Sequence, residues 1–443
     1  MLMEEGRSRS IRMIPLKTAH CAECKSGTEE ADGTLSPPEQ DYLCMPFGSE
    51  AHYATCLRDT ETFRRYIDQV LADAPELFPP EMGEGFCFYG AYRSRKQPIT
   101  LRRIRLAATG GVFQIRPSFL MPYLIGKTDE VEKALYLRQF DVPFEALAYV
   151  FGRDPMYWYR AWCALGRPAI VGTTVKDPSK LPKHLVADEK HTWLEGEKVY
   201  VATTAAGGSI LGAELAESAS TDALEEAYGV FAAEARLLDE DYAPETVCTD
   251  GWEATQSAWE KIFPAITVIL CFLHSVLMLW DRCAKNWPLR AEVTDRAWRV
   301  YHAATRAQFG QRIRRFREWA SAQLREGPVR EAVLKLCRRA QRFVPAFGFP
   351  EAHRTSNAVD RLMNHQDRHL YAMRYLHGTH ESARLALRAM ALLWNFHPYG
   401  ARTRQGAPQR LSPFHDLNGF QYHDNWLQNL LVAASLGGRR AST

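Results

Sequence analysis

The order of the expected elements between residues 185 and 270 constrains this chain more than any other feature. Alternating apolar positions and Gly-containing turns predict three strands, a helix, a strand, a second helix and a fifth strand. Consecutive strands followed by alternating helices and strands are typical of an α/β fold. The expected bounds are 185–193, 199–204 and 210–215 for the first strands, 221–238 for the helix, a strand ending at Asp250, then helix 253–262 and strand 265–270.

Three carboxylates occupy informative places in this pattern. Asp188 lies within the first expected strand, and Asp250 ends the fourth strand immediately before a Gly251 turn. Asp360 follows in Asn357-Ala-Val-Asp360, within a helix expected over 355–371. Taken singly, they could be a solvated strand end, a turn former and an i, i+4 helix partner. Together they suggest a site that holds two Mg²⁺ ions about 4 Å apart and catalyses phosphoryl transfer.

A segment of short helices precedes the strands. Helices are expected over 128–138, 142–151 and 156–165, with Thr and Asp caps, a Gly152-Arg153 turn and a Pro155 start. Two short helices joined by a tight glycine turn are typical of a helix-turn-helix. Trp158 and Trp162 would pack inward. A plain three-helix core explains the pattern equally well. The expected base-facing residues are Tyr157, Tyr159 and Arg160.

Charge is concentrated in one part of the chain. The net charge is only +3, but residues 282–342 hold 16 Lys/Arg against five Asp/Glu. A solvated helical face would also show such a composition. The excess nevertheless favours a polyanion partner, with phosphate contacts expected at Arg312, Arg314, Arg315 and Arg317.

The first part of the chain is harder to interpret. Residues 1–60 look loop-rich, and Cys21, Cys24, Cys44 and Cys56 could bind a structural zinc ion or be unrelated buried thiols. Short strands are expected between residues 85 and 125. The aromatic and basic stretches 92–96 and 101–105 could contact DNA backbone, although ordinary edge strands also carry such charges.

Nothing in the sequence predicts export or membrane insertion. The N-terminus has no apolar segment after its charges, so secretion is not expected. The ten cysteines lack a disulfide-like rhythm, which favours reduced thiols and a cytoplasmic, nucleoid-associated protein. The most apolar run, 265–280, is shorter than the ~20 residues of a spanning helix and is expected to be a buried strand entering a helix.

Over about residues 125–400 the chain resembles the DDE/D transposases of bacterial insertion sequences, with features shared with Mutator-like elements. The resemblance rests on Ala187-Asp188-Glu-Lys-His-Thr192, on Thr249-Asp250-Gly-Trp252 followed by Cys271-x2-His274, and on Arg354-Thr-Ser-Asn357-x2-Asp360-Arg361. The third acid of this family is often Glu, so Asp360 departs from the pattern by one methylene.

This resemblance implies a ribonuclease H-like core, interrupted by an all-helical insertion where the basic stretch falls. It implies that Asp188, Asp250 and Asp360 bind two Mg²⁺ or Mn²⁺ ions, with Cys271, His274 and Asn357 near the active site. The implied activity is cleavage of double-stranded DNA at the terminal inverted repeats of a mobile element, then strand transfer into target DNA. A homodimer or larger synaptic complex would pair the two ends.

The expected domains are a loop-rich region with a possible zinc site (1–84), a β-rich segment (85–126), a helix-turn-helix (127–167), the first part of the core (180–280), the basic insertion (281–350), the helices with the third acid (351–400) and a tail (401–443). Two alternatives remain open: a domesticated DNA-binding relative that no longer cuts, and a ribonuclease H-like nuclease or junction resolvase. An enzyme that does not act on nucleic acid is least expected, because the chain has neither a Gly-rich phosphate loop nor a Gly-x-Ser-x-Gly elbow.

Overall fold

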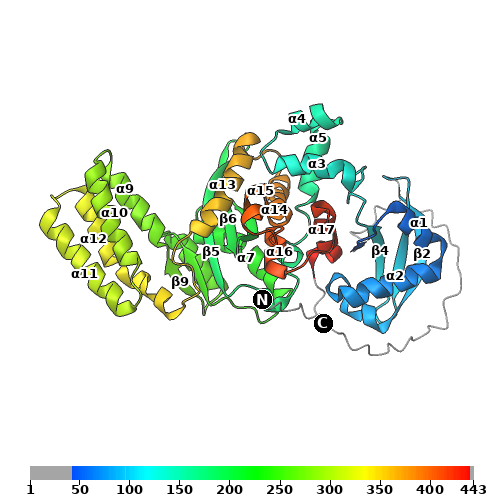
Figure 1. Cartoon of the computed structure of the whole chain (residues 1–443), viewed down its shortest axis with the longest axis horizontal. Helices are drawn as coiled ribbons and strands as arrows, with labels where there is room; N and C mark the ends of the chain where they lie inside the picture. The colour runs from blue at the N-terminus through cyan, green and yellow to red at the C-terminus, as the bar shows by residue number, and fades with distance from the viewer. Residues whose placement is uncertain (1–41, 95, 440–443) are drawn as a thin grey trace, which may run out of the picture.

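The computed structural model describes residues 42–94 and 96–439 as a mixed α/β protein with two mixed sheets, which agrees with the predicted α/β class. The molecule is elongated (Figure 1). The smaller sheet lies at one end, the larger sheet in the middle and a helical lobe at the other end.

The smaller sheet has the strand order β1-β4-β3-β2, in which only β1 and β4 are parallel. Helices α1 and α2 cover one of its faces, because Phe63, Ile67 and Val70 recur at helical spacing along α2 and are buried. The described residues before 60 thus contain a strand and a helix where loops were expected, and β1 joins the strands expected between 85 and 125. The elements are β1 (Tyr42–Met45), α1 (Glu50–Arg58), α2 (Thr60–Asp73), β2 (Phe86–Arg93), β3 (Thr100–Leu106) and β4 (Val112–Pro117), with short 3₁₀ turns η1 (Pro75–Leu77) and η2 (Pro80–Glu84).

Four helices connect the two sheets: α3 (Thr128–Arg138), α4 (Phe144–Phe151), α5 (Pro155–Ala164) and α6 (Ile170–Thr174). The start of α5 is as predicted, since the Asp154 carboxylate accepts a hydrogen bond from the Tyr157 amide at 2.9 Å. The expected caps Thr128 and Asp141 were wrong. Lys127 and Pro143 precede α3 and α4 instead. Asp141 has a positive φ of 65°, and its Oδ1 lies 2.5 Å from His369 Nδ1.

The larger sheet has the order β7-β6-β5-β8-β9. The first three strands are antiparallel neighbours, whereas β8 and β9 run parallel to β5. Helices α7 and α8 cover one face through Tyr228, Phe231 and Trp259, and α13 and α14 cover the other. All five predicted strands and both predicted helices are present. Their bounds are β5 (His184–Leu194), β6 (Glu197–Ala206), β7 (Ser209–Ala216), α7 (Thr221–Arg236), β8 (Thr246–Thr249), α8 (Glu253–Ile262) and β9 (Thr267–Leu270), preceded by η3 (Pro178–Lys180).

After β9 the chain leaves the sheet and builds the helical lobe around its own core of Phe272, Phe309 and Phe316. It returns to the sheet through η4 and η5. The run 265–280 is therefore a strand followed by a helix, as predicted, and no described helix is both long and apolar enough to cross a membrane. The lobe comprises α9 (Phe272–Cys283), α10 (Trp287–Tyr301), α11 (Arg306–Gln323), α12 (Pro328–Arg338), η4 (Ala340–Arg342) and η5 (Val344–Gly348).

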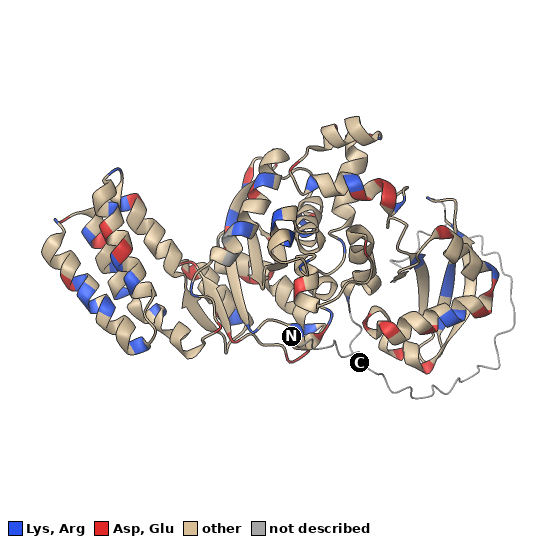
Figure 2. Ribbon diagram, viewed as in Figure 1, with Lys and Arg blue, Asp and Glu red and all other residues tan. Residues whose placement is uncertain are grey.

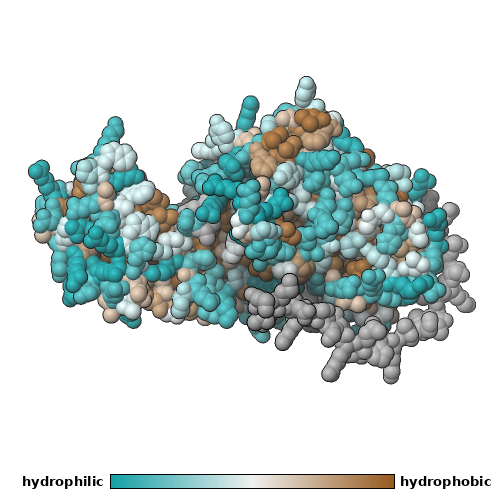
Figure 3. Space-filling model, in the orientation of Figure 1, coloured by the Kyte–Doolittle hydropathy of each residue, from teal (hydrophilic) through white to brown (hydrophobic). Residues whose placement is uncertain are grey.

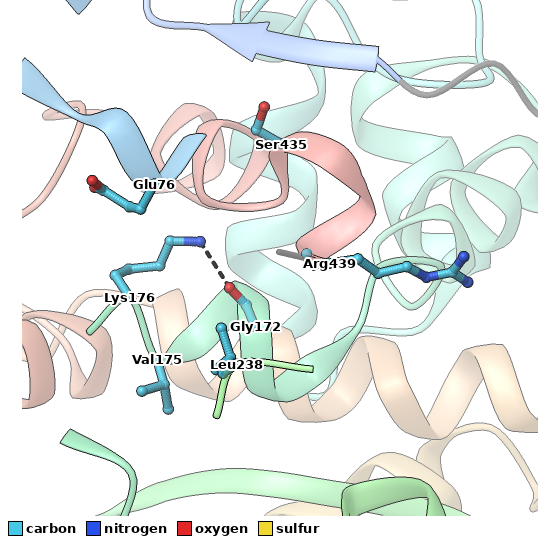
Figure 4. A pocket seen from close by; sticks show the side chains of 8 residues that line it. Glu76, Gly172, Val175, Lys176, Leu238, Ser435 and Arg439 are labelled. Atoms are coloured by element: carbon cyan, nitrogen blue, oxygen red, sulfur yellow. Dashed lines mark hydrogen bonds between the residues drawn. The ribbon is translucent and has the colours of Figure 1, made fainter. Parts of the chain in front are cut away.

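The C-terminal segments join the small and large sheets. Ser435 Oγ accepts a hydrogen bond from the Cys44 amide of β1, and Gly172 lets α6 approach the Gly438 carbonyl. At this junction Lys176 Nζ is buried and donates to the carbonyls of Gly172 and Ala433, both at 2.7 Å (Figure 4). The segments are α13 (Asn357–Ala372), α14 (His380–Phe396), α15 (Ala401–Gly406), α16 (Pro413–Asn418), α17 (Trp426–Ala433) and η6 (Ser435–Gly438).

Candidate active site

Asp188, in the middle of β5, and Asp250, directly after the end of β8, lie side by side. The two strands are parallel and pair Val186 with Cys248, so the same register two residues later places Asp188 beside Asp250. Strand β9 pairs Cys248 with Ile269, which extends the row to Cys271. Because side chains alternate along a strand, all three lie on the same face of the sheet as Val186 and Cys248.

A tight turn fixes the backbone around Asp250. The Asp250 carboxylate accepts a hydrogen bond from the Trp252 amide at 2.8 Å, and the Gln256 side chain donates to the Asp250 carbonyl at 3.1 Å. Gly251 lets the Arg339 guanidinium approach the backbone closely, because a Cβ atom at this position would lie 2.9 Å from Arg339 Nη1. The glycine therefore allows a guanidinium group to sit against the turn that carries the acid.

Glu189 is a third acid near these two, but it lies on the opposite face of β5. Its Oε1 accepts hydrogen bonds from the Tyr228 hydroxyl of α7 and from Thr255 Oγ1 of α8, both at 2.6 Å. Burial raises the pKa of Glu189 to about 7 despite these two donors, and the charges of Asp250 and Asp188 add to the rise. Glu189 therefore lies within electrostatic reach of both other carboxylates.

Cys271, which follows β9, and His274 of α9 both contact Ser356. The Ser356 amide donates to Cys271 Sγ at 3.1 Å, and Ser356 Oγ lies 3.4 Å from His274 Nδ1. Hydrogen bonding from Cys248, and then from His274 and Ser356, lowers the pKa of the Cys271 thiol. Cys271 raises the pKa of His274, and the charges of Asp188 and Asp250 add to the rise, which favours the protonated imidazole.

The helix that carries Asp360 begins at this cluster. Ser356 immediately precedes α13, so Asn357 and Asp360 lie in its first turn, next to Cys271 and His274. Further along, Gln366 Oε1 accepts a hydrogen bond at 3.1 Å from Thr203, the cross-strand partner of Asp188. The side chain of Asp360 is outside the described part of the structure. Asp367, on the same helix, pairs with Lys190 at 2.8 Å.

An open cavity of about 400 Å³ lies against the acidic row. Asp250, Gly251, Cys271 and His274 line its sheet side. Lys335 and Arg339, at the end of α12, line it from the helical lobe. Arg342 lies nearby and donates to Gln256 Oε1 at 2.6 Å. The Asp250 carboxylate and these cations thus face one cavity, an arrangement that suits a phosphodiester together with the divalent cations that oxygen ligands hold.

The residues expected to bind DNA have different surroundings. On α5, Arg160 is exposed, whereas the Tyr157 hydroxyl donates to the Ile125 carbonyl and the Tyr159 ring packs on Phe144. Trp158 and Trp162 are buried, as predicted. The outer surface of α4 and α5 is largely apolar (Figure 3), with Tyr149, Val150 and Met156 exposed.

On α11 the buried side chains Phe309, Ile313 and Phe316 form the inner face, so the arginines lie on the outer faces. Arg314, Arg315 and Arg317 are exposed and make no ion pair with any described residue. Arg312 is half-buried and donates to the Arg299 carbonyl. Figure 2 shows Lys and Arg positions recurring along the helices of this lobe.

The structure describes two of the four proposed zinc ligands. Cys44 lies in β1 and Cys56 in α1, and both are buried, whereas Cys21 and Cys24 lie outside the described residues. Among the described residues, no group of three His, Cys, Asp or Glu side chains is arranged to hold a metal ion.

Sequence reasoning missed Glu189, Ser356, Lys335 and Arg339. Glu189 directly follows Asp188, and strand alternation could have identified it as an acid on the helix-covered face. Ser356 could have been found from the expected start of its helix. No local signal identifies Lys335 and Arg339, because the folding of the helical lobe against the sheet brings them to the cavity.

A scan of protein-family models found no match to this chain, and a comparison with curated proteins found no similar sequence. The functional conclusion therefore depends on the geometry of the site and on the sequence motifs.

Proposed function

We propose that this protein is a DDE/D-type transposase with a ribonuclease H-like catalytic core. The observation that carries the proposal is the placement of Asp188 within the central strand β5 and of Asp250 directly after its parallel neighbour β8. The sheet order β7-β6-β5-β8-β9, with three antiparallel strands followed by two parallel ones, supports the proposal of this core. Helix α13, with Asp360 in its first turn, begins beside the same row.

The donor set fits hard divalent cations such as Mg²⁺, since carboxylate oxygens are their usual protein ligands. Asp188 and Asp250 would hold the ions, with Asp360 as the third ligand. When bound, two such ions activate the attacking oxygen and stabilise the leaving oxygen of a phosphodiester. No covalent enzyme intermediate is required, so the protein contributes positioning and electrostatics.

The cations around the cavity would hold the DNA strand. Lys335 and Arg339 face the acids from α12, and the imidazolium of His274 adds positive charge on the sheet side. Each can attract a phosphate oxygen close to the carboxylates. Further from the cavity, Arg314, Arg315 and Arg317 are exposed and unpaired with carboxylates, so they are suited to phosphate contacts along a longer duplex.

Recognition of element ends is assigned to the segment α4–α5 as a helix-turn-helix. Gly152 and Arg153 in the turn between the helices have positive φ angles. Helix α5 begins at Pro155, directly after its N-cap residue Asp154. Because Tyr157 and Tyr159 pack against protein, Arg160 is the favoured base-contacting residue of the three. The ends would be the inverted repeats of the element, with a dimer or larger complex pairing them.

The test is cleavage of a supercoiled plasmid that carries the genomic DNA flanking the coding region. With Mg²⁺ we expect nicks at the boundaries of inverted repeats, and no cleavage by Asp188→Asn or in EDTA. The control is Asp222→Asn, which removes an exposed carboxylate on α7 that pairs with Lys261.

Two outcomes would favour the alternatives. Mg²⁺-dependent cleavage without preference for the flanking DNA would indicate a ribonuclease H-like nuclease or resolvase. Specific binding of the flanks by the wild type, with no cleavage under any metal, would indicate a DNA-binding relative. Cleavage by Asp188→Asn at the wild-type rate would refute the assignment of the site.

A further inference from the structure

The N-terminal sheet has a second face that neither α1 nor α2 covers. Arg102 of β3 points toward these helices, because its Nη2 donates to the Leu57 carbonyl. Alternation along the strand sends Arg103 and Arg105 to the opposite face. Cross-strand pairing places Gln114 beside Arg103, and Tyr42 beside Gln114, on that same face. Figure 2 shows Lys and Arg positions on the strands of this sheet.

Arginine and tyrosine side chains on this face contact one another in two groups. In the first, the guanidinium carbons of Arg105 and Arg103 lie 3.6 Å and 5.4 Å from the Tyr89 ring centroid. In the second, Arg116 lies over Tyr42 at 4.1 Å. A ring attracts a guanidinium through its π face, so the cation is positioned without consuming all its N–H donors.

The second group continues beyond the sheet. Tyr123 stands edge-on to Tyr42 with ring centroids 6.4 Å apart, and Arg167 lies over Tyr123 at 4.4 Å. A cavity of about 210 Å³ opens here between the sheet and the body of the protein. Its lining includes Tyr42, Tyr123, Arg167, Glu381, Arg384 and Arg439. The one carboxylate, Glu381, is already paired with Arg384 at 2.9 Å.

Two arginine donors on this face, Arg103 Nε and Arg116 Nη1, are buried and have no acceptor among the described residues. Gln114 is only 6% exposed, and its side chain interacts with the Tyr92 hydroxyl. None of Arg103, Arg105, Arg116 and Arg167 forms an ion pair with a described carboxylate. Since buried donors are costly when unsatisfied, the face is suited to a ligand rich in acceptors and negative charge.

We propose that this face, which we call the Arg–Tyr face (Tyr42, Tyr89, Tyr92, Arg103, Arg105, Gln114, Arg116, Tyr123 and Arg167), binds an unpaired nucleic-acid strand. Phosphates would contact the arginines, and bases would stack on the half-exposed rings of Tyr89, Tyr92 and Tyr123. A duplex presents its backbone and groove edges but no base faces. The Arg–Tyr face is remote in sequence from Asp188 and Asp250, and strand binding there does not require cleavage at these acids.

The test measures binding of a fluorescein-labelled deoxythymidine homopolymer of about 20 nucleotides, by anisotropy in EDTA. Using Asp188→Asn as the parent removes cleavage from the experiment. We expect Arg103→Ala/Arg105→Ala to weaken binding at least about tenfold and to lower the salt slope by about 0.7 per lost phosphate contact. Tyr89→Ala/Tyr92→Ala should weaken binding roughly fivefold with little change of the salt slope.

The matched control is Arg58→Ala/Arg65→Ala, which removes two exposed arginines from α1 and α2 on the other side of the same domain. Equal weakening by this control would refute the proposal, as would unchanged binding in Arg103→Ala/Arg105→Ala. If Arg103→Ala/Arg105→Ala loses affinity for duplex DNA but binds the homopolymer as before, the face binds duplex backbone instead.

A second measurement tests the proposal without substitutions in the Arg–Tyr face, in case those variants do not fold. An oligonucleotide with 5-iododeoxyuridine is photocrosslinked to the otherwise intact Asp188→Asn protein, and the modified peptides are mapped. We expect crosslinks at Tyr89, Tyr92 or Tyr123. Crosslinks confined to other elements would overturn the proposal.

Discussion

Glu189 and Asp188 are neighbours in one strand, yet the sheet gives them different surroundings. Asp188 faces the row with Asp250 and Cys271, whereas Glu189 points between α7 and α8 and receives two hydroxyl donors. Asp188 Oδ1 accepts a hydrogen bond from the Glu189 amide at 3.0 Å, whereas Glu189 Oε1 accepts from the hydroxyls of α7 and α8. Glu189 is therefore a structural acid, and the charges of Asp250 and Asp188 contribute to its raised pKa.

The hydrogen bonds to Glu189 predict a small change in the free energy of unfolding for one substitution of this residue and a larger loss for another. Glu189→Gln keeps an acceptor oxygen for Tyr228 and Thr255, so it should change the free energy of unfolding by less than about 1 kcal/mol. Glu189→Ala leaves two buried hydroxyls unsatisfied and should cost about 2 kcal/mol or more. Urea unfolding at pH 7.5 measures both. Equal losses would show that the hydrogen bonds to Glu189 contribute little.

The third acid can be tested by comparing two residues of α13. Asp360→Ala should lower Mg²⁺-dependent cleavage roughly a hundredfold or more, while Asp360→Glu should preserve it. Asp367→Ala should cleave nearly normally, because Asp367 already pairs with Lys190. Rates on the plasmid substrate measure all three. The reverse result, with Asp367 essential and Asp360 dispensable, would mean that the third acid was misassigned.

At the residue scale the sequence predicted where two of the acids lie on the sheet. Asp188 is within β5 and Asp250 directly follows β8, as expected, and the parallel register of the two strands brings these positions together. The role of Gly251 was predicted only in part: the turn is present, but the glycine also makes room for Arg339. That contact joins segments nearly 90 residues apart and has no local signal.

At the scale of elements, helix starts were predicted correctly where the capping residue, proline or turn before the helix was present in the sequence. Helix α5 has an Asp cap and a proline at its first position, and α8 follows a turn, so both begin where expected. Helix α4 begins two residues late because Pro143, with an extended backbone, occupies the position before it. Asp141 is drawn instead into a tertiary contact with His369, which no local rule anticipates.

Helices α11 and α12 should make different contributions to DNA binding. Arg314→Ala/Arg315→Ala removes exposed charges remote from the cavity, so specific and random duplexes should lose affinity equally, with the salt slope falling by about 0.9 per lost contact. Lys335→Ala/Arg339→Ala removes cations that line the acidic cavity and should lower the cleavage rate more than the affinity. Anisotropy titrations and single-turnover cleavage separate the two effects. An unchanged salt slope for the α11 variant would contradict its role.

At the scale of the whole molecule, buried histidines lie where α13 and α14 pack against α3 and α5. His365 is buried, and its ring is tilted by 57° to that of His369, with the ring centroids 4.2 Å apart. Burial, with a contribution from the charge of His369, holds the pKa of His365 well below its usual range. The folded protein therefore keeps this imidazole neutral.

Acid should consequently loosen this junction. An unfolded histidine takes up a proton below about pH 6.5, whereas folded His365 does not, so the free energy of unfolding falls as the pH drops below that value. The slope from one such group is at most about 1.4 kcal/mol per pH unit. His365→Phe should reduce the loss between pH 7 and pH 5, measured by urea unfolding. An identical pH dependence in this variant would assign the acid sensitivity to other groups.

The arrangement of the lobes was the part that the sequence could least predict. The expected elements of the large sheet are all present, but the pairing of β1 with β4 and the return of η6 to β1 are contacts between distant segments. The Arg–Tyr face arises from that assembly. Its tyrosines and arginines come from β1, β2, β3 and β4 and from the connections that follow β4 and α5. Only folding brings them into one surface.

The central claim is that Asp250 ligates a divalent cation that is needed to cleave DNA. A change of metal preference tests it most directly, because a thiolate is a poor ligand for Mg²⁺ but an acceptable one for softer ions such as Mn²⁺. Asp250→Cys, assayed under reducing conditions on the flanking-DNA plasmid, should be inactive with Mg²⁺ and regain cleavage with Mn²⁺, whereas Asp222→Cys should behave like the wild type with both ions. Full activity of Asp250→Cys with Mg²⁺, or no recovery with Mn²⁺, would contradict the assignment of Asp250 as a metal ligand.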